Sequence, residues 1–146
     1  MKYSIIKTVL VFLFSLNTGW ADIIITEIAD PNDDLGARYI EIHNSGGSSV
    51  TLTDYYIIRW TNGNADATVS TPIDLSSYTL AVGGFLIFAR NSSTFNSTFS
   101  VGSNTTVVNE GTGGPADSNG DDNLAIVTET SARLTSDWSS DVCSSD

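Results

Sequence analysis

Two clusters of acidic and amide side chains are the first candidates for chemistry in this chain of 146 residues. Calcium takes several hard oxygen ligands from flexible loops, and each cluster offers carboxylates a few residues apart. The calcium candidates are Asp30, Asp33 and Asp34, with Asn32 beside them, and Asp117, Asn119, Asp121 and Asp122. The second cluster resembles the start of an EF-hand loop, but Gly120 stands at the fourth position rather than the sixth and Thr128 replaces the bidentate glutamate. The prediction of calcium binding is therefore based only on the number of possible ligands. The alternative is that the two clusters are turns whose charged side chains are solvated.

Three further side chains have acid–base chemistry, namely Glu27, Glu41 and His43. Two carboxylates whose pKa values differ can protonate a leaving group and activate water. The glutamates, however, lie in β-branched segments, where we expect them to hydrogen-bond neighbouring backbone or to face an arginine such as Arg38. The sequence has no nucleophile-elbow serine, no histidine and cysteine cluster, and no phosphate-binding glycine loop ahead of a helix. We therefore predict no catalytic residues, no enzyme activity, and no cofactor other than the calcium alternative.

The segments that must position these side chains alternate as β-strands do. The expected strands cover residues 23–28, 38–43, 50–53, 55–60, 85–88, 105–108 and 123–127. The second of them places Ile40 and Ile42 on one face, and Tyr39, Glu41 and His43 on the other. No window sustains a helical period over three turns, and the Ser-, Thr- and Asn-rich stretch 91–106 is expected to be a polar loop. Short strands separated by turn residues predict an all-β, antiparallel sandwich.

Two details of this pattern concern the core and the turns. In the aromatic strand, alternation puts Tyr56, Ile58 and Trp60 on one face, and we expect that face to be buried in the core. The dipeptide Asn62 and Gly63 follows this strand. It favours a two-residue type I′ hairpin, because both positions take positive φ at low cost.

Both ends of the chain differ in composition from the middle. Residues 1–21 have lysines ahead of an apolar stretch and small residues up to Ala21, which is typical of an export signal cleaved there; a retained membrane anchor is the alternative. The apolar stretch is shorter than the roughly 20 residues that span a bilayer, so we expect no span after cleavage. Residues 137–146 show no alternation and closely resemble a translated sequencing adapter, so we expect an artefact tail. One domain, residues 22–136, remains.

This expected domain is strongly acidic. The full chain has 17 Asp and Glu against 6 Lys and Arg, and residues 22–136 hold 14 carboxylates, four arginines and no lysine. Such a surface repels DNA and anionic lipid, so direct nucleic acid binding is not expected. The single cysteine, Cys143, falls in the expected tail, so burial rather than disulfides must stabilise the domain.

Five sequence blocks occur in a characteristic order. They are 24–28 (IITEI), 39–44 (YIEIHN), 50–56 (VTLTDYY), 80–87 (LAVGGFLI) and 119–126 (NGDDNLAI). Together they resemble the lamin-tail domain family in its exported bacterial form. The resemblance implies an immunoglobulin-like β-sandwich used as a non-catalytic module. Nuclear lamins carry such a domain after a coiled-coil rod, whereas this chain has no heptads, so filament formation is not implied.

The resemblance also sets the expected function. In the family the last block is followed by further strands, so we expect this domain to lack its last strands and to expose a sheet edge. We expect a monomeric binding or scaffolding module, secreted or held in the cell envelope of a bacterium, with an unknown protein or cell-surface partner. The alternative is the N-terminal accessory domain of a secreted hydrolase, such as an extracellular nuclease, whose catalytic part is missing.

Overall fold

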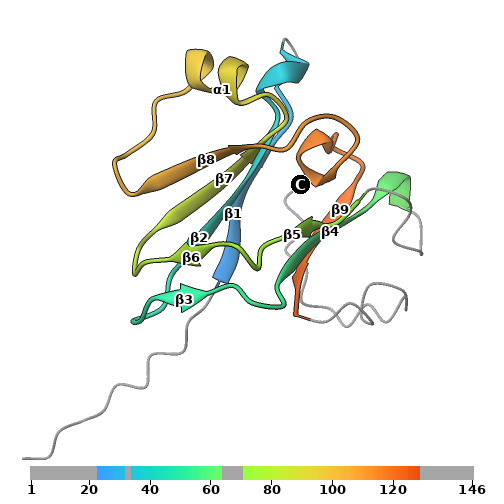
Figure 1. Cartoon of the computed structure of the whole chain (residues 1–146). Coiled ribbons are helices and arrows are strands. Elements are labelled where there is room, and N and C mark those ends of the chain that lie inside the picture. Colours follow the sequence, from blue (N-terminus) through green and yellow to red (C-terminus); the bar gives the residue numbers. More distant parts are fainter. Residues whose placement is uncertain (1–22, 32–33, 64–70, 129–146) are drawn as a thin grey trace, which may run out of the picture.

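The computed structural model describes residues 23–31, 34–63 and 71–128, which form a β-sandwich (Figure 1). The expected export signal and adapter-derived tail lie outside the described residues, as do Asn32 and Asp33. The strands are β1 (Ile23–Ala29), β2 (Tyr39–Asn44), β3 (Val50–Thr51), β4 (Tyr56–Trp60), β5 (Ile73–Asp74), β6 (Thr79–Leu80), β7 (Phe85–Ala89), β8 (Thr105–Asn109) and β9 (Asn123–Val127). The helices are α1 (Ser92–Thr98) and the 3₁₀ turns η1 (Leu35–Ala37), η2 (Thr61–Gly63) and η3 (Pro115–Asp117). None of these described helices is long and apolar enough to cross a membrane.

The strands form two layers. One layer is a four-stranded sheet in the order β1-β2-β7-β8, and the facing layer holds the three-stranded sheet β5-β4-β9 and the two-stranded sheet β3-β6 (Figure 1). This arrangement confirms the predicted all-β, immunoglobulin-like sandwich. Among the described strands, every pair is antiparallel except β7 and β8, which run parallel. A parallel neighbour needs a crossover connection, and α1 with the loop after it supplies one.

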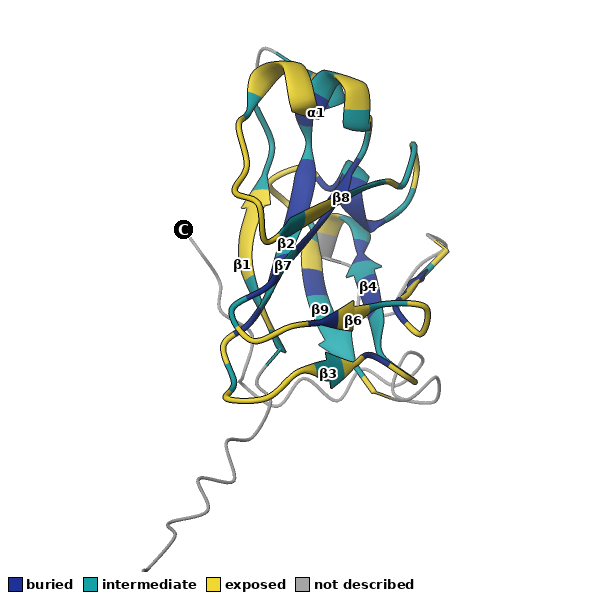
Figure 2. Cartoon of the chain, turned by 60° about the vertical axis from the view of Figure 1, so that its left-hand side comes forward, coloured by how far each residue is buried: buried dark blue, intermediate teal, exposed yellow. Residues whose placement is uncertain are grey.

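The main core lies between the layers and follows the alternation of β2. Ile40 and Ile42 are fully buried, as predicted, while Glu41 and His43 lie on the opposite face of the strand. The two central strands β2 and β7 carry much of the buried surface (Figure 2). The core cluster contains Ile40, Ile42, Leu52, Ile57, Ile73, Leu75, Leu80, Leu86, Phe88, Ala116 and Leu124. Full burial of each large apolar side chain contributes about 1.5–3 kcal/mol.

The helix α1 covers one end of the outer face of the four-stranded sheet (Figure 2). The prediction of a polar loop over 91–106 is therefore wrong for this segment. Asn91 caps the helix by accepting two backbone N–H groups of the first turn, at 3.0 and 3.1 Å. Phe95 and Phe99, one turn apart, pack against Tyr39 with ring centroids 4.9 and 5.3 Å away. A seven-residue helix is not stable alone, so α1 depends on this aromatic contact.

In strand β4 the predicted face is buried at Ile58 and Trp60, as expected, but the opposite face is buried as well. The inward residue of β4 is the fully buried Ile57, and the buried Ile58 and Trp60 lie on the other face. Both faces carry large apolar side chains, so alternation does not distinguish them. Arg59 pairs with the core residue Leu124 of β9 and shares the inward face with Ile57. Its side chain is only 10% exposed, at the end of the core.

The predicted two-residue hairpin after β4 is also wrong. Ile57 pairs with Ile73 of β5, a register that requires a longer connection. Residues Thr61–Gly63 form η2 instead. Asn62 does adopt the left-handed conformation that the dipeptide favours, with a φ of 53°.

Candidate functional site

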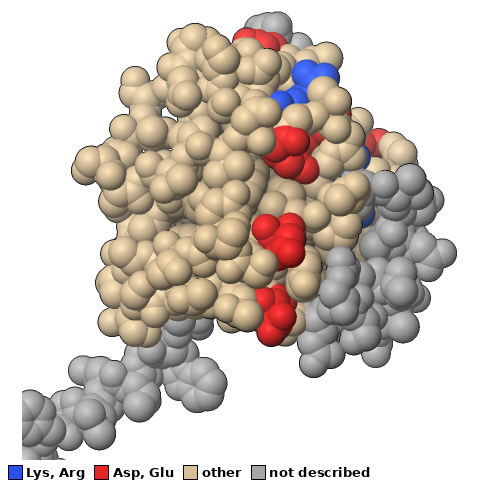
Figure 3. Space-filling model, viewed as in Figure 1, with Lys and Arg blue, Asp and Glu red and all other residues tan. Residues whose placement is uncertain are grey.

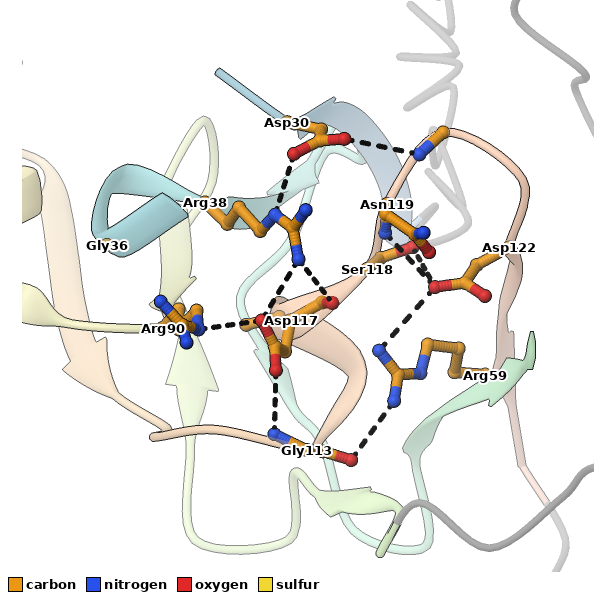
Figure 4. A network of polar contacts seen from close by, with 12 residues as sticks. Asp30, Gly36, Arg38, Arg59, Arg90, Gly113, Asp117, Ser118, Asn119 and Asp122 are labelled. Carbon is orange, nitrogen blue, oxygen red and sulfur yellow. Dashed lines mark hydrogen bonds and ion pairs between the residues drawn. The ribbon is translucent and has the colours of Figure 1, made fainter. Parts of the chain in front are cut away.

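The two acidic clusters meet at one end of the sandwich, around the guanidinium of Arg38 (Figure 4). Arg38 Nε donates to Asp30 Oδ1 at 2.6 Å, and Nη1 donates to a side-chain oxygen and to the backbone oxygen of Asp117, both at 3.2 Å. Asp30 Oδ2 accepts the N–H of Gly120 at 3.4 Å. Burial alone lowers the pKa of Arg38, but the hydrogen bonds and charges of the two aspartates outweigh it and raise that pKa. Arg38 therefore stays charged and joins the clusters.

Asp117 also holds a second arginine. Arg90 follows β7, and its Nε forms an ion pair at 2.7 Å with the same Oδ1 that Arg38 contacts (Figure 4). Asp117 Oδ2 accepts the N–H of Gly113 at 3.0 Å. The arginines are adjacent because β2 and β7 are neighbours, and Arg90 N–H donates to the Arg38 C=O at 2.9 Å. Asp117 thus contacts two guanidiniums, whose side chains are 15% and 25% exposed, and Arg38 has Asp30 as a further partner.

The ion pairs of the described arginines form one polar network with Asp30, Asp117 and Asp122. Its third arginine, Arg59, pairs with Asp122. Arg59 Nη1 lies 3.5 Å from Asp122 Oδ2, and Nη2 donates to the Gly113 C=O at 3.1 Å. The Asp122 side chain is 2% exposed, and its Oδ2 also accepts the hydroxyl of Ser118 and the N–H of Asn119, both at 3.1 Å. Asp122 therefore organises the turn before β9 as well as neutralising Arg59.

The remaining calcium candidates have separate positions. Asp34 caps η1 by accepting the N–H of Gly36 at 3.0 Å, Asp121 is exposed, and Asp33 lies outside the described residues. Within 23–31, 34–63 and 71–128, no three His, Cys, Asp or Glu side chains are grouped so as to hold a metal ion. Every arginine in these ranges pairs instead with an aspartate of the two clusters. Calcium binding stays a prediction of the sequence.

Glu110 is a half-buried carboxyl beside the network. Its Oε2 accepts the N–H of Ala116 at 2.6 Å. Burial raises the pKa of Glu110 to about 7, although that hydrogen bond and the charge of Arg59 act in the opposite direction; the charge of Asp117 adds to the rise. A Cβ at Gly114 would overlap Glu110 Oε1, so a side chain there would displace this carboxyl.

The predicted acid–base glutamates lie opposite one another on the outer face of the sheet. Glu27 of β1 pairs in register with Glu41 of β2. Glu41 Oε1 accepts the hydroxyl of Thr26 at 2.7 Å. Burial raises the pKa of Tyr39, as do its interaction with Glu27 and the charges of both glutamates. The expectation that the glutamates face Arg38 is wrong, because that guanidinium is committed to aspartates.

His43 shares this outer face but packs on an aromatic neighbour. Its ring stacks on Phe85 of β7, with centroids 4.3 Å apart and planes 18° from parallel. On the β1 side its register partner is Ile24. His43 is half-buried, and it lies on the face of β2 that the alternation predicted.

A family model described as Lamin Tail Domain matches residues 17–139. The chain belongs to the lamin-tail domain family. No curated protein matches it. The family match includes every residue that the structure describes, so the arginine and aspartate network lies inside the lamin-tail domain.

Sequence reasoning missed two arginines of this lamin-tail network, Arg59 and Arg90, and the neighbouring carboxyl of Glu110. Arg90 directly follows an apolar strand, and Arg59 interrupts one. In a domain without lysine, an arginine at such a position must find a carboxylate, since an unpaired buried charge is costly. The sequence therefore indicated that these arginines need carboxylate partners. Which carboxylates they find is decided by the packing of the two layers. Glu110 gave no signal, because its burial depends on the path of the loop over it.

Proposed function

We propose that this lamin-tail domain is a non-catalytic, exported binding or scaffolding module. Membership of the family supports a non-catalytic domain. One observation carries the proposal: all three arginines of the described residues are paired with Asp30, Asp117 or Asp122. Catalysis needs charged groups aimed at a site where a reacting atom can sit. Groups that are committed to one another stabilise the fold instead.

The predicted export signal at residues 1–21 supports a location outside the cytoplasm, secreted or in the bacterial cell envelope. The partner we propose is a protein or cell-surface component. The described residues contain ten carboxylates against three arginines, so DNA and anionic lipid are repelled. We propose a monomer for the same reason, since two copies carry the same excess charge.

Two assays on the protein purified from the exported fraction test this proposal. In the first, the protein is incubated with double-stranded DNA and with phosphoester and carboxyl-ester substrates, and we expect no turnover above the blank. Turnover that Glu41→Gln abolishes, and that Asp121→Asn leaves unchanged, would contradict the non-catalytic assignment. In the second, the immobilised protein is exposed to envelope extract, and we expect it to retain a specific partner. Immobilised bovine serum albumin at the same salt concentration is the control and should not retain that partner.

The alternative, an accessory domain of a secreted hydrolase, is based on the family resemblance. The sequence of the intact gene distinguishes it from the binding module proposed above. Sequencing the intact gene downstream of the codon for Ser136 is the test. A nuclease or other hydrolase domain there would make the module an accessory domain, whereas a short tail and a stop codon would remove that alternative.

A further inference from the structure

Strand β8 leaves one edge of the four-stranded sheet open. Among the described residues it pairs only with β7, and Figure 1 shows it as the outermost strand of its layer. The open edge of a strand presents peptide N–H and C=O groups that can pair with another strand.

Two hydrogen bonds at the ends of β8 set the phase of its peptide groups. The C=O of Asn104 accepts an N–H from the first residue of β7 at 3.1 Å, and the N–H of Glu110 donates to the last residue of β7 at 2.9 Å. In a parallel pair, every second residue directs both its N–H and its C=O at the neighbour. Asn104 and Glu110 are an even number of residues apart, so both direct their peptide groups at β7, as do residues 106 and 108. Val107 and Asn109 lie between these positions and therefore direct their peptide groups away from β7.

The two edges of the sheet differ in their protection against a further strand. At the other edge, β1 has a bulge at Thr26 and a charged residue, Glu27. Bulges and edge charges are the usual devices that prevent edge-to-edge pairing. Strand β8 keeps unbroken register with β7 over five pairs, and its sequence Thr-Thr-Val-Val-Asn has no charge and no proline. It therefore lacks the devices that β1 has.

The charge distribution distinguishes the occupants that this edge would accept. Figure 3 shows no charged residue on the face over β6, β7 and β8, while carboxylates gather along its border. Every arginine of the described residues is already paired, so the remaining field is negative. A second copy of the domain brings the same negative field, whereas a cationic segment is attracted to it.

We propose that the edge of β8 receives an extended strand of a partner protein, in which alternating β-branched residues are flanked by lysine or arginine. This inference rests on the proposed binding function and names the partner's chemistry. Main-chain hydrogen bonds to Val107 and Asn109 provide affinity, as in other cases of strand addition. The basic flanks are attracted by the excess negative charge of the domain.

A labelled peptide of sequence Lys-Val-Thr-Val-Thr-Val-Lys tests the proposal on the full chain. Amide hydrogen exchange by NMR should show Val107 and Asn109 protected at saturating peptide, with the amide of Val108 already protected without it. A charge placed on the edge should prevent pairing, so Thr106→Lys should weaken the peptide about tenfold, by fluorescence polarisation. The matched control, Thr53→Lys, makes the same charge change at an exposed turn and should bind within about twofold of wild type.

Three results would overturn the inference: no protection of the two amides, equal weakening by both lysine variants, or protection that grows with protein concentration in the absence of peptide, which would indicate a second copy. Thermal melts of both variants must match wild type, so that a loss of binding reports the edge rather than unfolding. A partner captured from envelope extract separates this inference from the proposed function. If Thr106→Lys retains that partner as well as wild type does, the β8 assignment is wrong and the binding function stands.

Discussion

Asn44, at the end of β2, is fully buried, and its side-chain amide is hydrogen-bonded at both ends. Its Nδ2 donates to the C=O groups of Ser48, Leu80 and Ala81 at 2.8, 3.1 and 3.2 Å, and its Oδ1 accepts a backbone N–H at 3.0 Å. Asn44→Ala leaves these groups unpaired, so we expect a loss of about 2–4 kcal/mol in the free energy of unfolding, measured with urea. Asn96→Ala, on the exposed side of α1, should change it by less than about 0.5 kcal/mol. Equal losses would mean that the amide has no special role.

A second residue-scale prediction concerns Asp117, the carboxylate shared by Arg38 and Arg90. Asp117→Asn leaves the mostly buried guanidinium of Arg90 without a carboxylate, while Arg38 keeps only its ion pair with Asp30. Since the pairs keep some solvent contact, we expect a loss of about 2–3 kcal/mol rather than the larger value of a fully buried pair. Asp121→Asn makes the same chemical change at an exposed position and should be nearly neutral. A loss of similar size in both variants would point to net charge and not to the network.

At the scale of elements, prediction from sequence succeeded where the two faces of a strand differ. In β2, Ile40 alternates with Glu41, so the inward face was unambiguous. In β4, Ile57 and Ile58 are equally apolar, and only the packing of the opposite sheet decides that Ile57 faces the core. The helix α1 was missed because its stability comes from a contact with Tyr39, far away in the sequence. Local propensity alone does not contain that information.

The helix α1 therefore depends on its aromatic anchor. Phe95 is 1% exposed and packs against Tyr39. We expect Phe95→Ala to cost about 3–5 kcal/mol, because it removes this burial and leaves a cavity. Hydrogen exchange should then show the amides of α1 losing protection before those of β2. Ser93→Ala, on the exposed side of the helix, serves as the control and should retain α1. Persistent protection of the helix in Phe95→Ala would contradict this dependence.

The loop from Glu110 to η3 should respond to pH. Burial raises the native pKa of Glu110 to about 7, whereas an unfolded glutamate titrates near 4.5. Between these values the native state binds more protons, so this stabilisation is complete below about pH 4.5 and is lost as the pH rises through about 7. Glu110→Gln keeps a neutral side chain at every pH. We therefore expect the stability of wild type relative to this variant to fall between about pH 5 and pH 8, measured by urea unfolding. A difference that does not change with pH would contradict the assigned pKa.

At the scale of the whole molecule, the meeting of the acidic clusters was not predictable from their local sequence. Asp30 and Asp117 lie on loops far apart in the chain, and each cluster alone reads as a calcium loop or a solvated turn. They converge because the loop after β1 and η3 lie at the same end of the sandwich, where Arg38 enters between them. The composition did contain the relevant constraint. A domain with arginines but no lysine, and with a large excess of carboxylates, is expected to use its few cations in pairs.

This excess of negative charge leads to a prediction for the whole domain. The described residues hold ten carboxylates and three arginines, and those arginines are mostly buried in the network. Raising NaCl from about 10 mM to about 100 mM shortens the Debye length from about 30 Å to about 10 Å, which screens repulsion between exposed carboxylates more than it weakens the buried pairs. We therefore expect Tm to rise by a few degrees, measured by circular dichroism. A Tm that falls with salt would mean that the ion pairs dominate.

Calcium and magnesium chlorides at matched ionic strength separate screening from a specific site. If the arginines hold Asp30, Asp117 and Asp122, both divalent salts should raise Tm equally. A ligand that binds only the native state stabilises it by RT ln(1 + [L]/Kd), so a calcium site would add a rise that grows with calcium concentration and is absent with magnesium. An extra rise in Tm with calcium would support the calcium site predicted from the sequence. If Asp121→Asn then lost this extra rise, the ion would lie on the exposed turn before β9. Without an extra rise, the carboxylates of the network serve the arginines alone.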